Sequence, residues 1–317
     1  MTHRIKIIHT LGFVCAFLLL LWSGSEYMLQ QSLRPGRGLV PEASWNKMCQ
    51  LYPHIKPWKD SLTSAKAVRD TFICAPDGDK LHAYFIPAVH ANSKTAVIVH
   101  GYGGNGIEMM MIGYMYHHDM GYNVLLPDLN YCGLTDGEAY QMGWKDRTDV
   151  QQWMEVANTL FGGNTQMVVH GISMGAATTM MVAGEKQPAY VKCFVEDCGY
   201  TSVWDEFQGE LKNQYHLPAF PLLYTSSVLC KLKYGWSFKE ASALKQVAKC
   251  HLPMFFIHGD NDDYVPTWMV HPLYQAKPDP KELWLVPDAQ PQHARSYMHN
   301  REVYTEKVKT FTSKYIQ

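Results

Sequence analysis

One short stretch near the middle of the chain constrains the fold more than any other. Residues 166–170 form a mostly apolar run that leads directly into a Gly-x-Ser-x-Gly motif at residues 171–175 and then into small residues. The pattern predicts a buried strand, a sharp turn at Ser173 and a helix over Met174–Lys186. Glycines at 171 and 175 let the strand and the helix approach closely enough to hold such a turn.

The predicted turn gives Ser173 the setting of a nucleophile. Its hydroxyl would project at the edge of the sheet, and the N-terminus of the next helix would direct unpaired N–H groups and positive dipole charge at the same point. A serine on a glycine-rich turn can also be a solvated surface residue. The strand before the motif and the helix after it favour a nucleophile elbow instead.

Length, composition and charge bound the remaining possibilities. A chain of 317 residues that is 47% apolar can bury one large core, and α/β folds of this size commonly form a single domain. The formal net charge is -1 and the sequence contains no long basic run, so bulk electrostatics recruit neither nucleic acid nor an anionic membrane surface. The sequence does not indicate an oligomeric state.

The N-terminal segment predicts a membrane partner of another kind. Arg4 and Lys6 precede an apolar run from Ile7 to Trp22, and the small residues 23–25 follow. The run suits a signal anchor over residues 1–25, although a cleaved signal peptide or a buried helix would share its features. Basic residues on the N-terminal side would place the rest of the chain outside the cytoplasm, periplasmic or at the cell surface if anchored and secreted if cleaved. We favour the uncleaved anchor.

The rest of the chain divides into a linker and lead-in segment over residues 26–65 and a main domain over residues 66–317. Two extended runs around Asp77-Gly78 predict an antiparallel hairpin. Alternating strands and helices then predict a mostly parallel central sheet flanked by helices. Strands are expected at residues 68–74, 80–86, 95–100, 122–127, 166–170, 191–196, 253–258 and 282–286, and helices at 108–120, 144–161, 174–186, 267–276 and 303–315.

The alternation stops between residues 201 and 249. This segment is crowded with aromatic and leucine side chains and is too long for a plain connection. We expect a helical cap insertion at the C-terminal edge of the sheet. It could shape an apolar pocket above Ser173 or pack on the flank of the sheet.

A serine nucleophile needs a base and a group that orients the base. The strand at 253–258 is followed by three candidate acids, Asp260, Asp262 and Asp263. The last strand is followed by a loop whose single histidine is His293, which makes it the predicted base. The expected chain order of serine, acid and histidine is kept.

The oxyanion side of the site is also predictable. The strand at 95–100 runs into a glycine-rich turn at residues 101–104. This turn can bring a backbone N–H group over a substrate carbonyl, so the N–H groups of Tyr102 and Met174 are the expected pair. Each such donor is worth about 3 kcal/mol in the transition state.

These motifs together resemble the α/β-hydrolase superfamily over about residues 68–316, and more closely the membrane-anchored bacterial serine hydrolases similar to Bem46 and the catalytic domains of prolyl-oligopeptidase-like hydrolases. The resemblance rests on the turn at 100–104, the motif at 171–175, the run Gly259-x-x-Asp262-x-x-Val265-Pro266 and His293-Ala294. It implies that Asp262 is the acid, whereas Asp197 serves this role in some relatives. Many relatives carry Arg-Gly-His-Gly where this chain has residues 129–133, a loop expected to border the pocket.

The resemblance implies acyl transfer by Ser173, His293 and Asp262 without a cofactor. A carboxylesterase acting on a small acyl ester is the first expectation. A serine peptidase acting on short peptides, and a thioesterase or acyltransferase, are the alternatives; a non-catalytic anchored binding protein is the least favoured. The eight cysteines are scattered without metal-ligand spacing, so no metal is expected.

Overall fold

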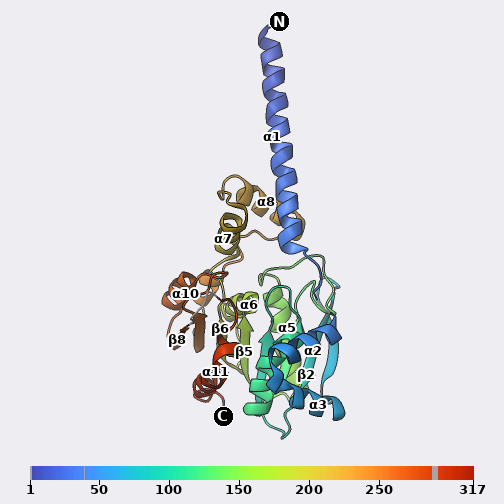
Figure 1. Ribbon diagram of the computed structural model, residues 1–317, viewed down its shortest axis with the longest axis vertical. Coiled ribbons are helices and arrows are strands. Elements are labelled where there is room, and N and C mark those ends of the chain that lie inside the picture. The colour runs from blue at the N-terminus through green and yellow to red at the C-terminus, as the bar shows by residue number, and fades with distance from the viewer. Residues whose placement is uncertain (1, 39, 288–291) are drawn as a thin grey trace.

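The computed structural model describes residues 2–38, 40–287 and 292–317. Its centre is an eight-stranded sheet with the strand order β1-β2-β4-β3-β5-β6-β7-β8 (Figure 1). Strand β2 runs antiparallel to β1 and β4, and the other neighbouring strands are parallel. The strands are β1 (Arg69–Cys74), β2 (Lys80–Ile86), β3 (Lys94–Val99), β4 (Asn123–Asp128), β5 (Gln166–Ile172), β6 (Val191–Asp197), β7 (Met254–Gly259) and β8 (Lys281–Val286). The predicted hairpin and mostly parallel sheet are confirmed.

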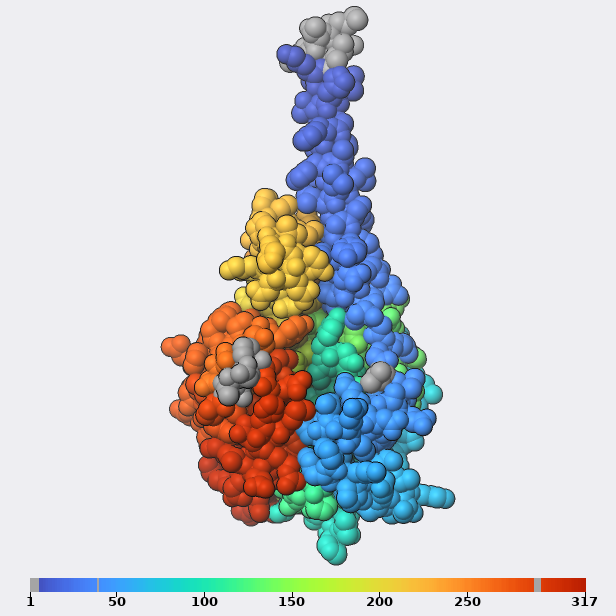
Figure 2. All heavy atoms as spheres, viewed as in Figure 1, coloured from blue at the N-terminus to red at the C-terminus, as the bar shows by residue number. Residues whose placement is uncertain are grey.

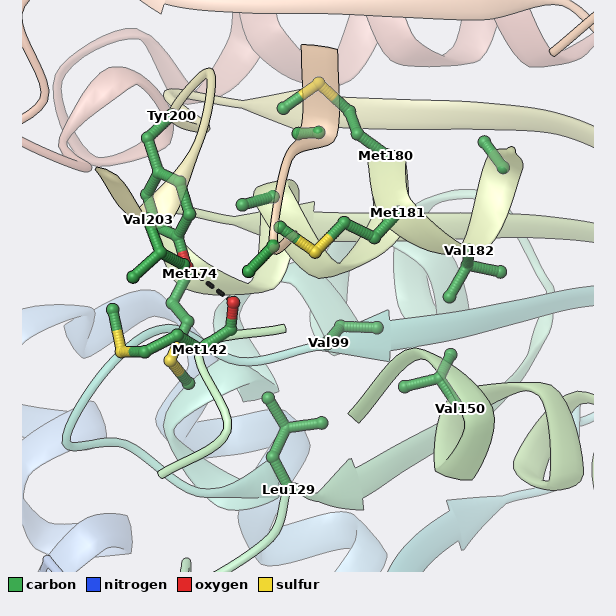
Figure 3. Packing of buried hydrophobic residues seen from close by; sticks show 14 of the residues in the cluster. Val99, Leu129, Met142, Val150, Met174, Met180, Met181, Val182, Tyr200 and Val203 are labelled. Atoms are coloured by element: carbon green, nitrogen blue, oxygen red, sulfur yellow. Dashed lines mark hydrogen bonds between the residues drawn. The ribbon is translucent and has the colours of Figure 1, made fainter. Parts of the chain in front are cut away.

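Helices cover both faces of the sheet, and the sheet divides the core into two apolar clusters. One cluster lies under α2 (Pro41–Leu51), α3 (Lys56–Ser64), α4 (Met110–Tyr114) and α11 (Ser296–Thr312). The other lies under α5 (Asp146–Leu160), α6 (Met174–Ala183), α9 (Ala243–Val247) and α10 (Val270–Ala276). Figure 3 shows part of the second cluster, in which Met181 and Val182 of α6 lie on the side of Val99 and Val150, whereas Met180 points the other way.

The prediction of one regular helix over residues 108–120 is wrong. The chain forms a 3₁₀ turn at Gly106–Met109, the short helix α4, and a π turn at Met115–Asp119. The π turn places His117 inside, where its Nδ1 accepts a hydrogen bond from Trp58 at 3.1 Å and its Nε2 lies 3.1 Å from the Pro87 carbonyl oxygen. A tertiary contact with α3 therefore replaces regular helix geometry here.

The N-terminal helix α1 (Thr2–Leu33) continues well past residue 25. Its stretch from Ile7 to Leu20 is exposed along its whole length, and the helix is long and apolar enough to cross a membrane. From Ser25 onward every fourth residue is buried, namely Ser25, Leu29 and Leu33. This spacing places one face of the helix against the domain, while the N-terminal half projects away from it (Figure 1).

The cap consists of two helices, α7 (Val203–Tyr215) and α8 (Leu222–Tyr234). They stand beside α1 on the side of the domain from which α1 projects, as the space-filling view also shows (Figure 2). Ser25 on α1 donates a hydrogen bond to Thr225 on α8 at 2.6 Å. The predicted helical insertion is confirmed, and the last turn of the segment, α9, packs against α6 instead of joining the cap.

One buried histidine ties the central strand to the last helix. His170 on β5 lies between two tyrosine hydroxyls, with Nδ1 3.1 Å from Tyr116 and Nε2 3.0 Å from Tyr304. Because the Tyr304 hydroxyl donates to Asp197 at 3.1 Å, it accepts from His170. Burial lowers the pKa of His170 to about 3, so the folded protein holds it neutral.

This arrangement predicts an acid-dependent loss of stability. His170 binds a proton in the unfolded chain below its ordinary pKa of 6.5, but in the folded chain only near pH 3. The free energy of unfolding should therefore fall as pH drops through this window, by up to about 1.4 kcal/mol per pH unit from this group. In urea titrations between pH 4 and 7, His170→Gln should show a shallower fall than the wild type. An identical pH dependence in both proteins would contradict this assignment.

Candidate active site

The predicted sharp turn is present, and Ser173 occupies it with φ 60° and ψ -122°. The two flanking glycines hold it there by close backbone contact. A Cβ atom on Gly171 would lie 2.0 Å from the carbonyl oxygen of Gly175, and one on Gly175 would lie 2.1 Å from the carbonyl oxygen of Val99. No side chain fits at either position, so only glycine allows β5, α6 and β3 to meet at this point.

The structure brings three of the predicted site residues together in one hydrogen-bonded relay. The Ser173 Oγ lies 2.7 Å from Nε2 of His293, and Nδ1 of His293 lies 2.7 Å from Oδ2 of Asp262. The other carboxylate oxygen of Asp262 accepts hydrogen bonds from the N–H groups of Tyr264 and Val265, both at 3.0 Å. With Nδ1 donating to the carboxylate, Nε2 is free to accept the proton of the serine hydroxyl.

Geometry also separates Asp262 from the alternative acids. Asp260 and Asp263 are exposed, whereas Asp262 is buried and faces His293. Asp197, at the end of β6, instead accepts hydrogen bonds from Ser296 at 3.2 Å and Tyr304 at 3.1 Å. Burial raises the pKa of Asp197 to about 7. Residues 288–291 of the loop that leads to His293 lie outside the described part of the chain.

The glycine-rich turn after β3 lies directly beside the serine. A Cβ atom on Gly101 would lie 3.3 Å from the Cβ atom of Ser173. The buried His100 holds this turn, since its Nε2 accepts from the Leu129 N–H at 2.9 Å and its Nδ1 donates to the Gly101 carbonyl oxygen at 2.7 Å. Burial lowers the pKa of His100, which keeps the ring neutral and this pair of bonds in place.

The two predicted oxyanion residues flank Ser173. Tyr102 follows Gly101 in the turn, and Met174 is the first residue of α6, where backbone N–H groups have no partner within the helix. Contrary to expectation, the loop at residues 129–133 contributes no side chain to the described pocket lining. It acts on the site through the Leu129 N–H, which positions His100.

The end of α1 contacts the oxyanion turn, a feature that the sequence did not suggest. The Tyr102 hydroxyl donates to the Ser32 carbonyl oxygen at 2.9 Å, and the Tyr102 ring lies against Tyr140 with centroids 4.7 Å apart. Tyr140 in turn donates its backbone N–H to the Leu33 carbonyl oxygen at 2.8 Å. The N-terminal helix thus helps to position the turn that carries Tyr102.

A cavity of about 320 Å³ opens above Ser173 between α1, α7 and α8. Its walls are mostly apolar, and the N-terminal helix supplies one of them. The lining residues include Met28, Leu29, Tyr102, Met142, Met174, Tyr200, Phe207, Leu211, Tyr215, Leu222, Leu223, Phe238 and Tyr264. On the cavity floor Tyr200 donates its hydroxyl proton to the Met142 carbonyl oxygen at 2.9 Å (Figure 3). The one sequence signal that could have predicted this role of α1 is the four-residue spacing of Ser25, Leu29 and Leu33, which the prediction of an anchor did not use.

Two carboxyl groups of α7 also line this cavity. Glu206 is 4% exposed, and its Oε2 has no hydrogen-bond partner in the part of the chain that the structure describes. Burial raises the pKa of Glu206 well above its ordinary value and also raises that of Glu210, which accepts a hydrogen bond from Gln214. The uncharged acid is therefore the favoured form of Glu206, which suits an apolar ligand.

A second, more open cleft of about 670 Å³ lies on the His293 side of the serine. It is more polar than the first cavity, and its lining consists of Tyr102, Ser173, Asp263, Tyr264, Gln292, His293, Arg295 and His299. Ser173 borders both spaces. The hydroxyl therefore stands between an apolar chamber and a polar cleft that is accessible to water.

The same region contains one group of potential metal ligands. Donor atoms of Cys198, Asp262 and His293 lie within 4.8 Å of one another. However, Asp262 and His293 already hydrogen-bond each other, and burial raises the pKa of the Cys198 thiol well above its ordinary value. A buried thiol that keeps its proton is a poor ligand, so these residues fit the hydrogen-bonded relay better than a metal site.

Comparison with known proteins places this geometry in a family. Residues 115–317 match the model of the prolyl oligopeptidase family. The chain belongs to this family. Among curated proteins it is 29% identical over 254 residues to the uncharacterized protein YqkD of Bacillus subtilis, covering 80% of this chain and 82% of YqkD.

Two solved structures share the fold of this member of the prolyl oligopeptidase family. Esterase Pf2001 of Pyrococcus furiosus superposes with a TM-score of 0.63 at 23% identity, over 79% of this chain and 93% of the esterase. The acylaminoacyl peptidase of Pyrococcus horikoshii superposes with a TM-score of 0.56 at 16% identity, over 77% of this chain but 41% of the peptidase. The predicted α/β-hydrolase fold is confirmed, while the closer likeness to Bem46-type hydrolases stays a prediction.

The glycine contacts at the turn give a direct test of its construction. Gly175→Ala would push a methyl group to 2.1 Å from the Val99 carbonyl oxygen, so β3 and α6 would have to separate. We expect a loss of at least about 2 kcal/mol in the free energy of unfolding. Gly209→Ala is the matched control, because a Cβ atom there contacts nothing within 4 Å and α7 should gain stability. Equal stability of both variants in denaturant titrations would refute the close approach.

Proposed function

We propose that this chain is a serine hydrolase that cleaves carboxylic esters through an acyl-enzyme formed on Ser173. The observation that carries the proposal is the Ser173–His293–Asp262 relay, with both contacts at 2.7 Å, standing at the mouth of an apolar cavity. Membership of the prolyl oligopeptidase family supports serine-dependent hydrolysis. The choice of ester follows from the cavity and from the low demand that esters make on leaving-group assistance.

In the proposed reaction, Nε2 of His293 takes the hydroxyl proton as Ser173 Oγ attacks the substrate carbonyl. Asp262 holds the tautomer of the ring and stabilises the imidazolium that forms. The backbone N–H groups of Tyr102 and Met174 would bind the oxyanion. The imidazolium then gives its proton to the leaving alcohol. A water molecule, deprotonated by His293, attacks the acyl-enzyme, and His293 returns that proton to Ser173 Oγ as the acid is released.

The two spaces beside Ser173 suggest which part of the ester lies where. The apolar cavity suits the acyl chain, because its walls bury hydrocarbon and the carboxyl group of Glu206 favours its uncharged form. The polar cleft on the His293 side suits the leaving alcohol and the incoming water. This orientation places the leaving oxygen on the side of the general acid.

We also propose that α1 stays attached as a membrane anchor, with the catalytic domain outside the cytoplasm. Ser25, at the expected cleavage position, is buried within a continuous helix and hydrogen-bonded to Thr225. Residues 28–35 supply part of the cavity wall. Cleavage here would cut a continuous helix and remove the contacts of Gly24 with Leu222 and of Ser25 with Thr225. The basic residues that precede the apolar run support the orientation.

Ester turnover tests the nucleophile. Ser173→Ala should lower kcat/KM for p-nitrophenyl esters by at least about 10³-fold, because the covalent step is lost. Ser313→Ala, an exposed serine at the end of α11, is the control and should keep full activity. Esters of graded chain length should show an optimum set by the cavity. Undiminished turnover by folded Ser173→Ala protein would disprove the proposal.

The role of Asp262 is tested by a matched pair of variants. Asp262→Asn should lower kcat by about 10³- to 10⁴-fold, since the amide would favour the wrong tautomer of His293. Asp260→Asn changes an exposed neighbour and should alter kcat by less than about tenfold. Steady-state kinetics on one p-nitrophenyl ester compare the two. Equal effects of the two substitutions would remove Asp262 from its proposed role.

A serine peptidase is the second candidate, favoured by the open polar cleft and by the family to which the chain belongs. The acylaminoacyl peptidase that shares the fold is covered over only 41% of its length by this chain. Esters and p-nitroanilides with the same acyl group distinguish the two activities. An esterase should cleave the ester far faster, whereas comparable kcat/KM values would favour the peptidase.

A further inference from the structure

The cap carries a cluster of exposed apolar side chains, which we name the cap face. It consists of Leu217, Phe220, Tyr224, Val228 and Leu232, with Phe220 71% and Leu232 70% exposed. The last three are spaced by four residues on α8 and therefore share one side of that helix. Elsewhere in the described domain, exposed large apolar residues such as Val89 and Val303 are scattered, which is ordinary for a protein surface.

The position of α1 indicates what covers the cap face. A Cβ atom on Gly24 would lie 3.3 Å from Leu222 at the start of α8, and Ser25 bonds Thr225 one turn later. The exposed apolar run of α1 ends at Trp22, which at the helical rise lies only about 3 Å along the axis from Gly24. The start of α8 therefore lies at the level where α1 would leave a membrane.

Figures 1 and 2 agree with this placement. The connection between α7 and α8 points the same way as the N-terminal half of α1, away from the sheet. Leu217 and Phe220 lie on that connection. Exposed Trp22 and Tyr27 on α1 add aromatic side chains at the same level, as is common at membrane–water interfaces.

We propose that the cap face rests in the interfacial layer of the bilayer that α1 crosses, and that the cavity takes the acyl chain of a lipid ester directly from that layer. The inference rests on the proposed ester hydrolysis and on the proposed anchoring. It goes further in naming the bilayer as the occupant of the cap face and a membrane-dissolved ester as the substrate class.

The cavity has the orientation that this route requires. Tyr215 and Leu222, which flank the connection between α7 and α8, line it at the cap end, and Ser173 and Met174 line it at the other. Met28 of α1 forms part of the wall between them. An acyl chain that leaves the bilayer beside α1 would thus reach Ser173 along a mostly apolar wall, to which Gln31, Glu210 and Gln214 add polar side chains.

Two lysines near the cap face already have acidic partners. The lysines near the end of α8 are already paired, Lys231 with Glu240 at 2.8 Å and Lys233 with Glu26. Lys239 lies over the ring of Tyr224, 5.3 Å from its centre. Vesicles of zwitterionic phosphatidylcholine carry no net charge, so they test the apolar contact of the cap face by itself.

The test uses the full chain reconstituted in phosphatidylcholine vesicles and two esters of 4-methylumbelliferone. The acetate is soluble in water, and the palmitate dissolves in the bilayer, so the leaving group is the same. The double variant Leu217→Glu/Phe220→Glu adds charge to the cap face, and neither residue lines the cavity. Val89→Glu adds charge at a remote exposed apolar position, 79% exposed, and is the matched control.

The double variant should hydrolyse the palmitate at least about tenfold more slowly than the wild type and the acetate at an unchanged rate, while Val89→Glu should match the wild type on both. Equal rates of the double variant and the wild type on the palmitate would overturn the inference. So would a wild type that cleaves the acetate but not the membrane-dissolved palmitate. By contrast, loss of both activities in the wild type, or activity that survives Ser173→Ala, would reject the proposed hydrolase itself.

Discussion

The site depends on one close approach of backbones. At the end of β5 the chain turns so tightly that Gly171 and Gly175 leave no room for a Cβ atom, and Gly175 lies against the carbonyl oxygen of Val99. This contact holds Ser173 at positive φ and fixes the start of α6 beside the turn that follows β3. The proposed nucleophile and both proposed oxyanion donors are placed by this single packing constraint.

Much of this arrangement was predictable because its determinants are local. The Gly-x-Ser-x-Gly motif predicts the turn, and the alternation of apolar strands with helices predicts the sheet. The ends of parallel strands lie at one edge of a sheet, so residues 102, 173, 262 and 293 were expected to meet there. The choice of Asp262 over Asp260 and Asp263 needed a family resemblance, since spacing along the loop cannot show which carboxylate faces His293.

The features that the sequence did not reveal depend on contacts between distant segments. The π turn at His117 follows from packing against Trp58 of α3, far away in the chain. The sequence of α1 likewise predicts only an apolar anchor. In the structure its last turns form a wall of the cavity and accept a hydrogen bond from Tyr102. The predicted end of the anchor at residue 25 rests on a change in composition. The helix itself continues to Leu33, because Ser25, Leu29 and Leu33 form a face that is buried against the domain.

The central claim is that Ser173 is a nucleophile activated by His293. Its most direct test is the reaction of the full chain with a fluorophosphonate, followed by proteolysis and mass spectrometry of the peptides. The account predicts a single adduct on the peptide that contains Ser173, and none in folded Ser173→Ala protein. A folded wild type that gains no adduct, or one that gains it on another residue, would contradict the account.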